Sequence, residues 1–127
     1  MVLVDTSVWI RFLAGHSVYG IELARLLDRE EVAAHEFIYG ELLAGDSGGR
    51  KRLLSDYERM WQLATIPHSE VAVFVRERGL AGRGIGWIDI HLLASAVVGR
   101  VRLWTANNRL QTIAKEFGLA HDTPQIT

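Results

Sequence analysis

The chain has 127 residues, of which 49% are hydrophobic and 23% are charged. That length fits one domain with a hydrophobic core, over residues 1–127, and the apolar content excludes an intrinsically disordered chain. The absence of cysteine excludes disulfides, thiolate zinc sites and a cysteine nucleophile. The formal net charge of −1 excludes a uniformly basic surface, so a nucleic-acid partner would need a local site.

Neither an internal repeat nor a low-complexity tract divides the chain. No apolar run reaches the length of about 18 residues that a membrane-spanning helix needs, and the first residues carry no signal-peptide pattern. We therefore expect a cytoplasmic protein with no membrane partner.

Short apolar runs alternate with amphipathic segments along the first half of the chain. Residues 2–4 are a continuous apolar run, which is typical of a strand buried on both faces. Asp5, Thr6 and Ser7 follow, and these residue types often begin a helix, which we expect over residues 8–13. The next expected elements are a helix over 18–29, a strand over 32–34 and a short helix over 37–44.

The second half continues the alternation. Apolar residues between 53 and 64 recur at a helical period and predict one long helix. Later helices are expected over 69–78, 87–98 and 108–117, and strands over 101–104 and 119–121. Strands that alternate with helices predict an α/β fold with three layers, α/β/α, around a central and mainly parallel sheet. In such sheets, sites form beyond the carboxyl ends of the strands.

Three acidic residues stand where this rule points. Asp5 directly follows the first strand, where it either caps the next helix or belongs to a site. Glu41 interrupts an apolar helix, so it either reaches solvent or is buried with a partner. Asp89 lies near the start of a helix, where the helix dipole favours negative charge, yet it shares the inward face of Leu92 and Leu93.

These carboxylates can converge at one edge of the sheet. Two like charges about 4 Å apart repel by about 4 kcal/mol at an effective dielectric constant near 20, so such a cluster needs a proton or a cation. An oxygen-only ligand set without cysteine favours a hard ion, Mg²⁺ or Mn²⁺. A magnesium ion held by carboxylates activates water and neutralises phosphate charge, so the pattern indicates metal-assisted hydrolysis of phosphodiester bonds.

Four segments, in order along the chain, carry a more specific signal. They are Asp5-Thr6-Ser7-Val8-Trp9, Gly40-Glu41-Leu42-Leu43, the segment from Gly84 to Ala96, and Leu103-Trp104-Thr105-Ala106-Asn107. Together they resemble the signature blocks of the PIN domain, and most closely those of the VapC toxins of bacterial type II toxin–antitoxin pairs. The resemblance covers essentially the whole chain. It implies a homodimeric, Mg²⁺- or Mn²⁺-dependent endoribonuclease that a VapB-type antitoxin holds inactive.

The same resemblance implies roles for individual residues. Asp5, Glu41 and Asp89 match the acidic catalytic residues, with Asp5 and Asp89 as the direct metal ligands. The hydroxyl of Thr6 or Ser7 would orient a metal-bound water. Glu41 would orient or deprotonate the water that attacks the RNA phosphodiester.

The sequence departs from the family pattern at the fourth catalytic position, Asn107, where the family usually has aspartate. Asparagine keeps an oxygen ligand but removes one negative charge, which weakens the hold on a second metal ion. It also suits helix capping and turns. A catalytically weak or inactive PIN-fold binding protein is therefore one alternative. A receiver-like phospho-acceptor module is another, although the two lysines, Lys51 and Lys115, do not follow strands.

An RNA substrate also needs positive charge near the acidic site. The segments expected around it carry Arg11, Arg50, Lys51, Arg52, Arg83 and Arg109. Among these, Arg11, Arg83 and Arg109 are the candidates for RNA contact, and each of them singly also fits a solvated surface arginine. The five histidines lack a metal-ligand spacing and are expected to be structural or at the surface. The four tryptophans are expected in the core, with Trp9 and Trp61 alternatively at a partner surface.

Overall fold

A parallel sheet lies at the centre of the computed structural model, which describes residues 1–125. Its strands are β1 (Val2–Val4), β2 (Val32–Ala33) and β3 (Arg102–Trp104), in the order β2-β1-β3. The central strand β1 is fully buried, as expected for a continuous apolar run in a parallel sheet. The predicted parallel sheet is confirmed.

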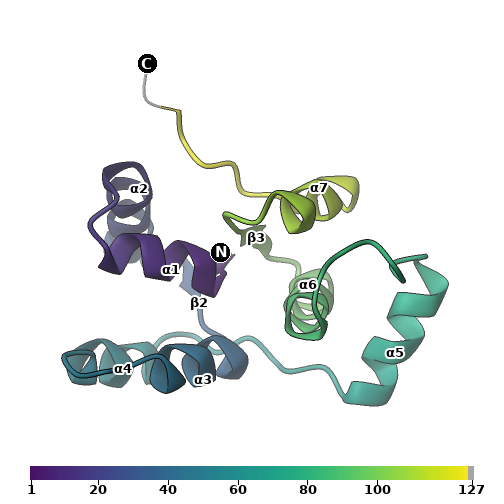
Figure 1. The fold of residues 1–127 in the computed structure, drawn as a ribbon, viewed down its shortest axis with the longest axis horizontal. Helices are drawn as coiled ribbons and strands as arrows, with labels where there is room; N and C mark the ends of the chain where they lie inside the picture. Colours follow the sequence, from purple (N-terminus) through teal and green to yellow (C-terminus); the bar gives the residue numbers. More distant parts are fainter. Residues whose placement is uncertain (126–127) are drawn as a thin grey trace.

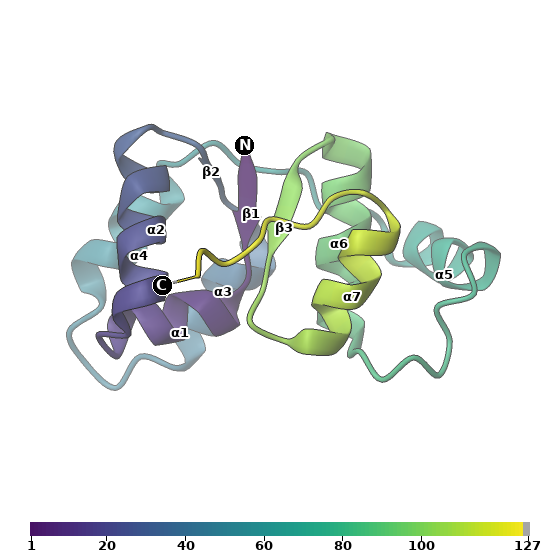
Figure 2. The ribbon, with the colours of Figure 1, turned by 90° about the horizontal axis from the view of Figure 1, so that it is seen from above.

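Helices surround the sheet, as the three-layer α/β/α architecture requires (Figure 1). They are α1 (Thr6–Leu13), α2 (Ser17–Asp28), α3 (Glu36–Ala44), α4 (Lys51–Glu58), α5 (His68–Glu77), α6 (Trp87–Gly99) and α7 (Asn108–Glu116). In Figure 2, α5 lies at the edge of the molecule beyond α6. Across residues 1–125, no helix combines the length and the apolar content needed to cross a bilayer.

The carboxyl ends of the parallel strands meet at one edge of the sheet. Val4 at the end of β1 pairs with Trp104 at the end of β3. The N–H of Asp5 donates to the carbonyl of Trp104 at 2.9 Å, which extends the pairing by one residue. Helices α1 and α7 begin close to this edge, so the residues between strand and helix face the same region.

Helix α4 is shorter than the helical period of its apolar residues predicted, and it ends at Glu58 rather than near residue 64. Ala34 donates its N–H to the carbonyl of Trp61 at 2.8 Å, so the chain turns there to extend the sheet beside β2. The side-chain amide of Gln62 donates to carbonyls at the end of the helix at 3.1 to 3.4 Å. The backbone pairing and this cap end the helix at Glu58, although the apolar residues continue at a helical period.

The tryptophans divide into two pairs. Trp9 and Trp104 are fully buried, as predicted. Trp61 and Trp87 are 53% and 38% exposed, so the prediction that they lie in the core is wrong. Trp61 lies past the end of α4, and Trp87 begins α6 at the surface, where its ring lies 4.8 Å from that of His68.

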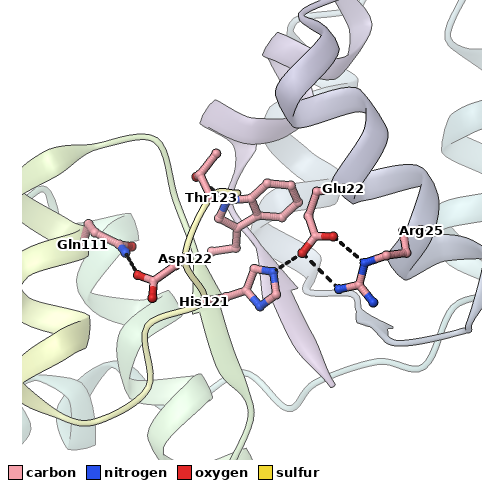
Figure 3. Close-up of polar contacts among 7 residues, drawn as sticks. Glu22, Arg25, Gln111, His121, Asp122 and Thr123 are labelled. Carbon is pink, nitrogen blue, oxygen red and sulfur yellow. Dashed lines mark hydrogen bonds and ion pairs between the residues drawn. The ribbon is translucent and has the colours of Figure 1, made fainter. Parts of the chain in front are cut away.

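The last described segment crosses β3 and reaches toward α2 (Figure 3). The strand expected over 119–121 is a single parallel bridge between Leu103 and Ala120. Further on, the indole N–H of Trp104 donates to the hydroxyl of Thr123 at 2.8 Å. These contacts fix the end of the described chain against the core.

Gly99, the last residue of α6, is where another side chain approaches the backbone most closely. A Cβ atom there would clash with Cδ1 of Leu63, which is buried. Gly99→Ala is therefore expected to lower the free energy of unfolding by about 2 kcal/mol, the usual size of overpacking. A Cβ at Gly40 on α3 meets no heavy atom within 4 Å, so Gly40→Ala should instead stabilise by about 0.5 to 1 kcal/mol. Urea unfolding measures both, and equal shifts in the two variants would contradict this account.

Candidate active site

Asp5 occupies the N-cap position of α1, but its carboxylate does not cap the helix. Its Oδ2 accepts hydrogen bonds from the hydroxyls of Ser7 and Thr105, each at 2.8 Å. The residue is only 5% exposed. Among residues 1–125 no donor contacts its other oxygen, Oδ1. Of the two roles that the sequence allowed, helix capping is therefore not the one observed.

A network of hydroxyls joins the ends of β1 and β3 around Asp5. The hydroxyls of Ser7 and Thr105 lie 3.3 Å apart, and each also accepts a backbone N–H, from Ala106 at 3.0 Å and Asn107 at 3.1 Å. Sequence reasoning did not single out Thr105 as a functional residue. The available signal was its position, because Thr105 follows β3 as Asp5 follows β1.

Glu41 lies on α3 and is tied to the start of α1. The hydroxyl of Thr6 donates to Oε1 of Glu41 at 2.7 Å, although the two residues are 35 positions apart in the sequence. The glutamate is exposed, so it both reaches solvent and has a partner. The hydrogen bond holds one carboxylate oxygen in place and leaves the second for other contacts.

Asp89 lies in the first turn of α6 and is partly buried. Burial and, after it, the negative charges of Asp5 and Glu41 raise the pKa of this carboxyl to about 6. Geometry supports this grouping, because Thr6, the neighbour of Asp5, donates to Glu41. The structure therefore groups Asp5, just before α1, with Glu41 on α3 and Asp89 on α6.

The burial of Asp89 near two other carboxylates has a measurable cost in metal-free protein. Because the folded pKa of Asp89 lies above its ordinary value of 3.8, ionisation of Asp89 destabilises the fold. The cost is absent below pH 3.8, grows as the pH rises and is complete above about 6. With EDTA present, Asp89→Asn is thus expected to raise the free energy of unfolding at pH 8 by about 1 to 2 kcal/mol, after allowance for solvent screening.

Urea unfolding of both proteins across this pH range measures that effect. The difference between Asp89→Asn and the unsubstituted protein should shrink as the pH falls toward 3.8. If the difference between the two proteins were the same at pH 8 as in acid, neither burial nor the neighbouring charges would destabilise ionised Asp89.

The donor set fits a hard divalent cation. Across the described part of the chain, no three acidic or histidine side chains are placed to hold one ion together. An ion here would thus have fewer protein ligands, with Asp5 and Asp89 as the pair. Mg²⁺ commonly takes one or two carboxylates and keeps several waters. Oδ1 of Asp5 and the raised pKa of Asp89 both suit a cation, which would relieve the repulsion.

Asn107 is engaged at the start of α7. Its side-chain oxygen accepts the backbone N–H groups of Arg109 and Leu110, at 2.9 and 3.3 Å. Asn107 is the N-cap of this helix, the structural role that its residue type suggested. Two donors thus already occupy the oxygen that would contact a metal ion.

The three arginines proposed for RNA contact have different surroundings. Arg11 donates to a carbonyl one turn earlier in α1 at 2.9 Å, and its guanidinium lies 5.5 Å from the ring of Tyr19. Arg109 packs its side chain against Gly84, in the loop that leads into α6. Arg83 pairs with Glu116 at 2.6 Å and lines a cavity at the far end of α6 from Asp89.

Comparison with known proteins decides the family. A model of the PIN domain matches residues 2–116. The chain belongs to the PIN-domain family. This PIN domain is 39% identical over 121 residues to Ribonuclease VapC32 of Mycobacterium tuberculosis, which covers 94% of this chain and 95% of that protein. It is 31% identical over 113 residues to Ribonuclease VapC19 of the same species, with 86% and 90% covered.

A solved structure shares the fold of this PIN domain. The crystal structure of PAE2754 from Pyrobaculum aerophilum superposes with a TM-score of 0.60 at 20% identity, and covers 96% of this chain and 88% of that one. At that identity the likeness concerns the fold alone. The predicted PIN fold is confirmed, and it replaces the receiver-like alternative.

Proposed function

We propose that this PIN domain is a Mg²⁺- or Mn²⁺-dependent endoribonuclease that hydrolyses phosphodiester bonds of RNA. The observation that carries the proposal is the convergence of three carboxylates, because the charges of both Asp5 and Glu41 act on Asp89. Similarity to proteins named ribonucleases along 94% of the chain supports the same class of reaction.

Asp5 and Asp89 would hold the cation. When bound, Mg²⁺ or Mn²⁺ supplies a Lewis acid that neutralises negative charge on the reacting phosphate. Ser7 and Thr105 hold the Asp5 carboxylate in one orientation, because both of their hydroxyls donate to the same oxygen. Hydrogen bonds of this kind orient ligating carboxylates and tune their affinity.

Glu41 is the general base in this proposal. Thr6 fixes one of its carboxylate oxygens, and the other accepts a proton from the attacking water. The water oxygen forms a bond to phosphorus as the bond from phosphorus to one ribose oxygen breaks. That ribose oxygen takes up a proton and leaves as a hydroxyl, so hydrolysis yields two shorter RNA strands.

The proposal is tested with purified protein and an end-labelled single-stranded RNA. Cleavage is expected in Mg²⁺ or Mn²⁺ and is expected to stop when EDTA is added. Undiminished cleavage in EDTA would refute the metal requirement. Intact RNA in both metals, with protein that is folded by circular dichroism, would favour the second candidate, a PIN-fold binding protein. The capping role of Asn107 is the observation that supports this candidate.

The biological role that we infer is that of a cytoplasmic toxin, homodimeric and paired with a VapB-type antitoxin. The name VapC, which the relatives carry, supports the toxin and its antitoxin partner. Exposed apolar side chains are available for such partners, with Ile21, Trp61 and Val98 at 69%, 53% and 65% exposure. Growth arrest on expression in bacteria, relieved by co-expression of the product of the adjacent gene, is the expected result.

A further inference from the structure

A cavity of about 560 Å³ lies where the C-terminal ends of α6 and α7 meet the loop after α5. Its volume is within the range of about 300 to 1,000 Å³ that is typical of small-molecule sites. Three arginines, Arg78, Arg83 and Arg100, line it together with one acidic residue, Glu116. The lining is therefore positive, although the whole chain has a formal net charge of −1.

Within the described residues, a carboxylate neutralises one of these three arginines. Arg83 forms a two-pronged ion pair with Glu116, at 3.0 and 2.6 Å. Within residues 1–125 no carboxylate lies at ion-pair distance from Arg78 or Arg100. Arg100, the residue that follows α6, has a φ of 55°, a backbone position that glycine usually takes. Two guanidinium groups are thus left for an anionic ligand.

The floor of the cavity is apolar and partly aromatic. Phe117 and Leu119 line it, and both are partly buried. The guanidinium of Arg78 lies 5.1 Å from the centre of the Phe117 ring, and Phe74 packs on that ring at 5.6 Å. Aromatic rings and arginine planes that stack bases, next to cations that contact phosphate, are typical of sites for single-stranded nucleic acid.

We propose that this cavity binds one nucleotide, with its base beside Phe117 and its phosphate at Arg78 and Arg100. The proposal rests on the proposed function for the origin of that nucleotide, which is a single-stranded segment of the RNA substrate outside the cleavage site. Helix α6 links the two sites, because Asp89 in its first turn and Val97 in the cavity are separated by about 12 Å along the helix axis. In this proposal, one RNA strand contacts both sites.

The test measures RNA binding in EDTA, by fluorescence anisotropy of a labelled single-stranded RNA. The variant R78Q/R100Q is expected to bind at least about 10-fold more weakly than the parent. The slope of log K against log salt should also become shallower by at least about 0.7, the value for one phosphate contact. Thermal unfolding confirms that the variant is folded.

The matched control is R52Q/R59Q. It removes the same charge from α4 and the residue that follows it, where these two arginines line a hollow that has no aromatic side chain. The side chain of Arg52 is 96% exposed to solvent. This control is expected to change the affinity by less than about twofold. Equal weakening in both double variants, or none in R78Q/R100Q, would overturn the nucleotide site.

Competition identifies the ligand. Displacement of RNA by AMP, but not by inorganic phosphate, would support a site for nucleotides in general. If neither AMP nor phosphate displaces RNA, the result would support a site that needs the RNA strand. Displacement by phosphate as effective as that by AMP would refute the base contact. The assay contains no metal, so binding without later cleavage in Mn²⁺ would defeat only the proposed function. If the parent cleaves RNA and R78Q/R100Q binds RNA as tightly as the parent, only this nucleotide site would be refuted.

Discussion

Asp5→Asn should lower the rate of RNA cleavage in Mg²⁺ or Mn²⁺ by at least about 100-fold, because hydrogen-bond partners of metal ligands alone are worth about 10- to 100-fold. The substitution keeps the shape of the side chain and an oxygen that can accept from Ser7 and Thr105. It removes the charge that attracts the cation. The fold should therefore survive while the reaction is lost.

Initial rates on an end-labelled RNA measure this effect. Asp28→Asn is the matched control, since it removes one negative charge from an exposed position at the end of α2 and should keep the full rate. Thr105→Val should give an intermediate loss of about 10-fold or more, because it removes one of the two hydroxyls that orient Asp5. An Asp5→Asn protein that is folded and fully active would end the assignment of this site.

The positions of the acidic residues could be predicted because they depend on local pattern. An apolar run followed by Asp5 marks a strand and its carboxyl end, and Asp89 shares a helix face with buried leucines. The partners of Asp5 could not be predicted in the same way. Its contact with Thr105 spans 100 positions and depends on the register that pairs Val4 with Trp104. No local pattern encodes a register between strands so far apart.

The errors in the fold have the same cause. Periodicity extended α4 past Glu58 because Met60 and Trp61 continue its apolar face. The pairing of that segment with Ala34 is a tertiary hydrogen bond, and it determines where the helix ends. Tertiary contact also sets the surroundings of Arg83, a candidate for RNA contact, which forms an ion pair with Glu116, 33 positions away.

The buried carboxylate of Glu22 is the feature that was hardest to predict from the sequence. Glu22 lies on α2 beside the apolar positions Leu23 and Leu26, and the whole residue is only 6% exposed. Its partners are Arg25 on the same helix and His121 in the last described segment (Figure 3). A helical stripe does not indicate that a distant histidine covers a glutamate. This pair therefore carries a prediction about stability that follows from the structure alone.

Glu22→Gln should lower the free energy of unfolding at neutral pH by about 3 kcal/mol. The Glu22 carboxylate accepts from Arg25 Nε at 2.5 Å and from His121 Nε2 at 2.7 Å. Glutamine has one acceptor oxygen, so one of these two donors would face an amide N–H group. The side chains of Glu22 and His121 are 7% and 6% exposed, whereas that of Arg25 is 42% exposed, which limits the loss to the lower end of the usual range.

The pH dependence distinguishes this charge effect from a simple packing defect. The hydrogen bond from Arg25 and, after it, that from His121 hold the pKa of Glu22 below 4.5, against the opposing effect of burial. A carboxyl whose pKa is lowered by folding stabilises the protein fully above 4.5, and this contribution is lost as the pH falls through the folded value. In urea unfolding, the difference in free energy of unfolding between the parent and Glu22→Gln should therefore shrink as the pH falls. The control is Glu77→Gln, at an exposed position on α5, whose free energy of unfolding should follow that of the parent at every pH. A gap that stays constant into acid would mean that the Glu22 charge contributes nothing, and that shape alone explains the loss.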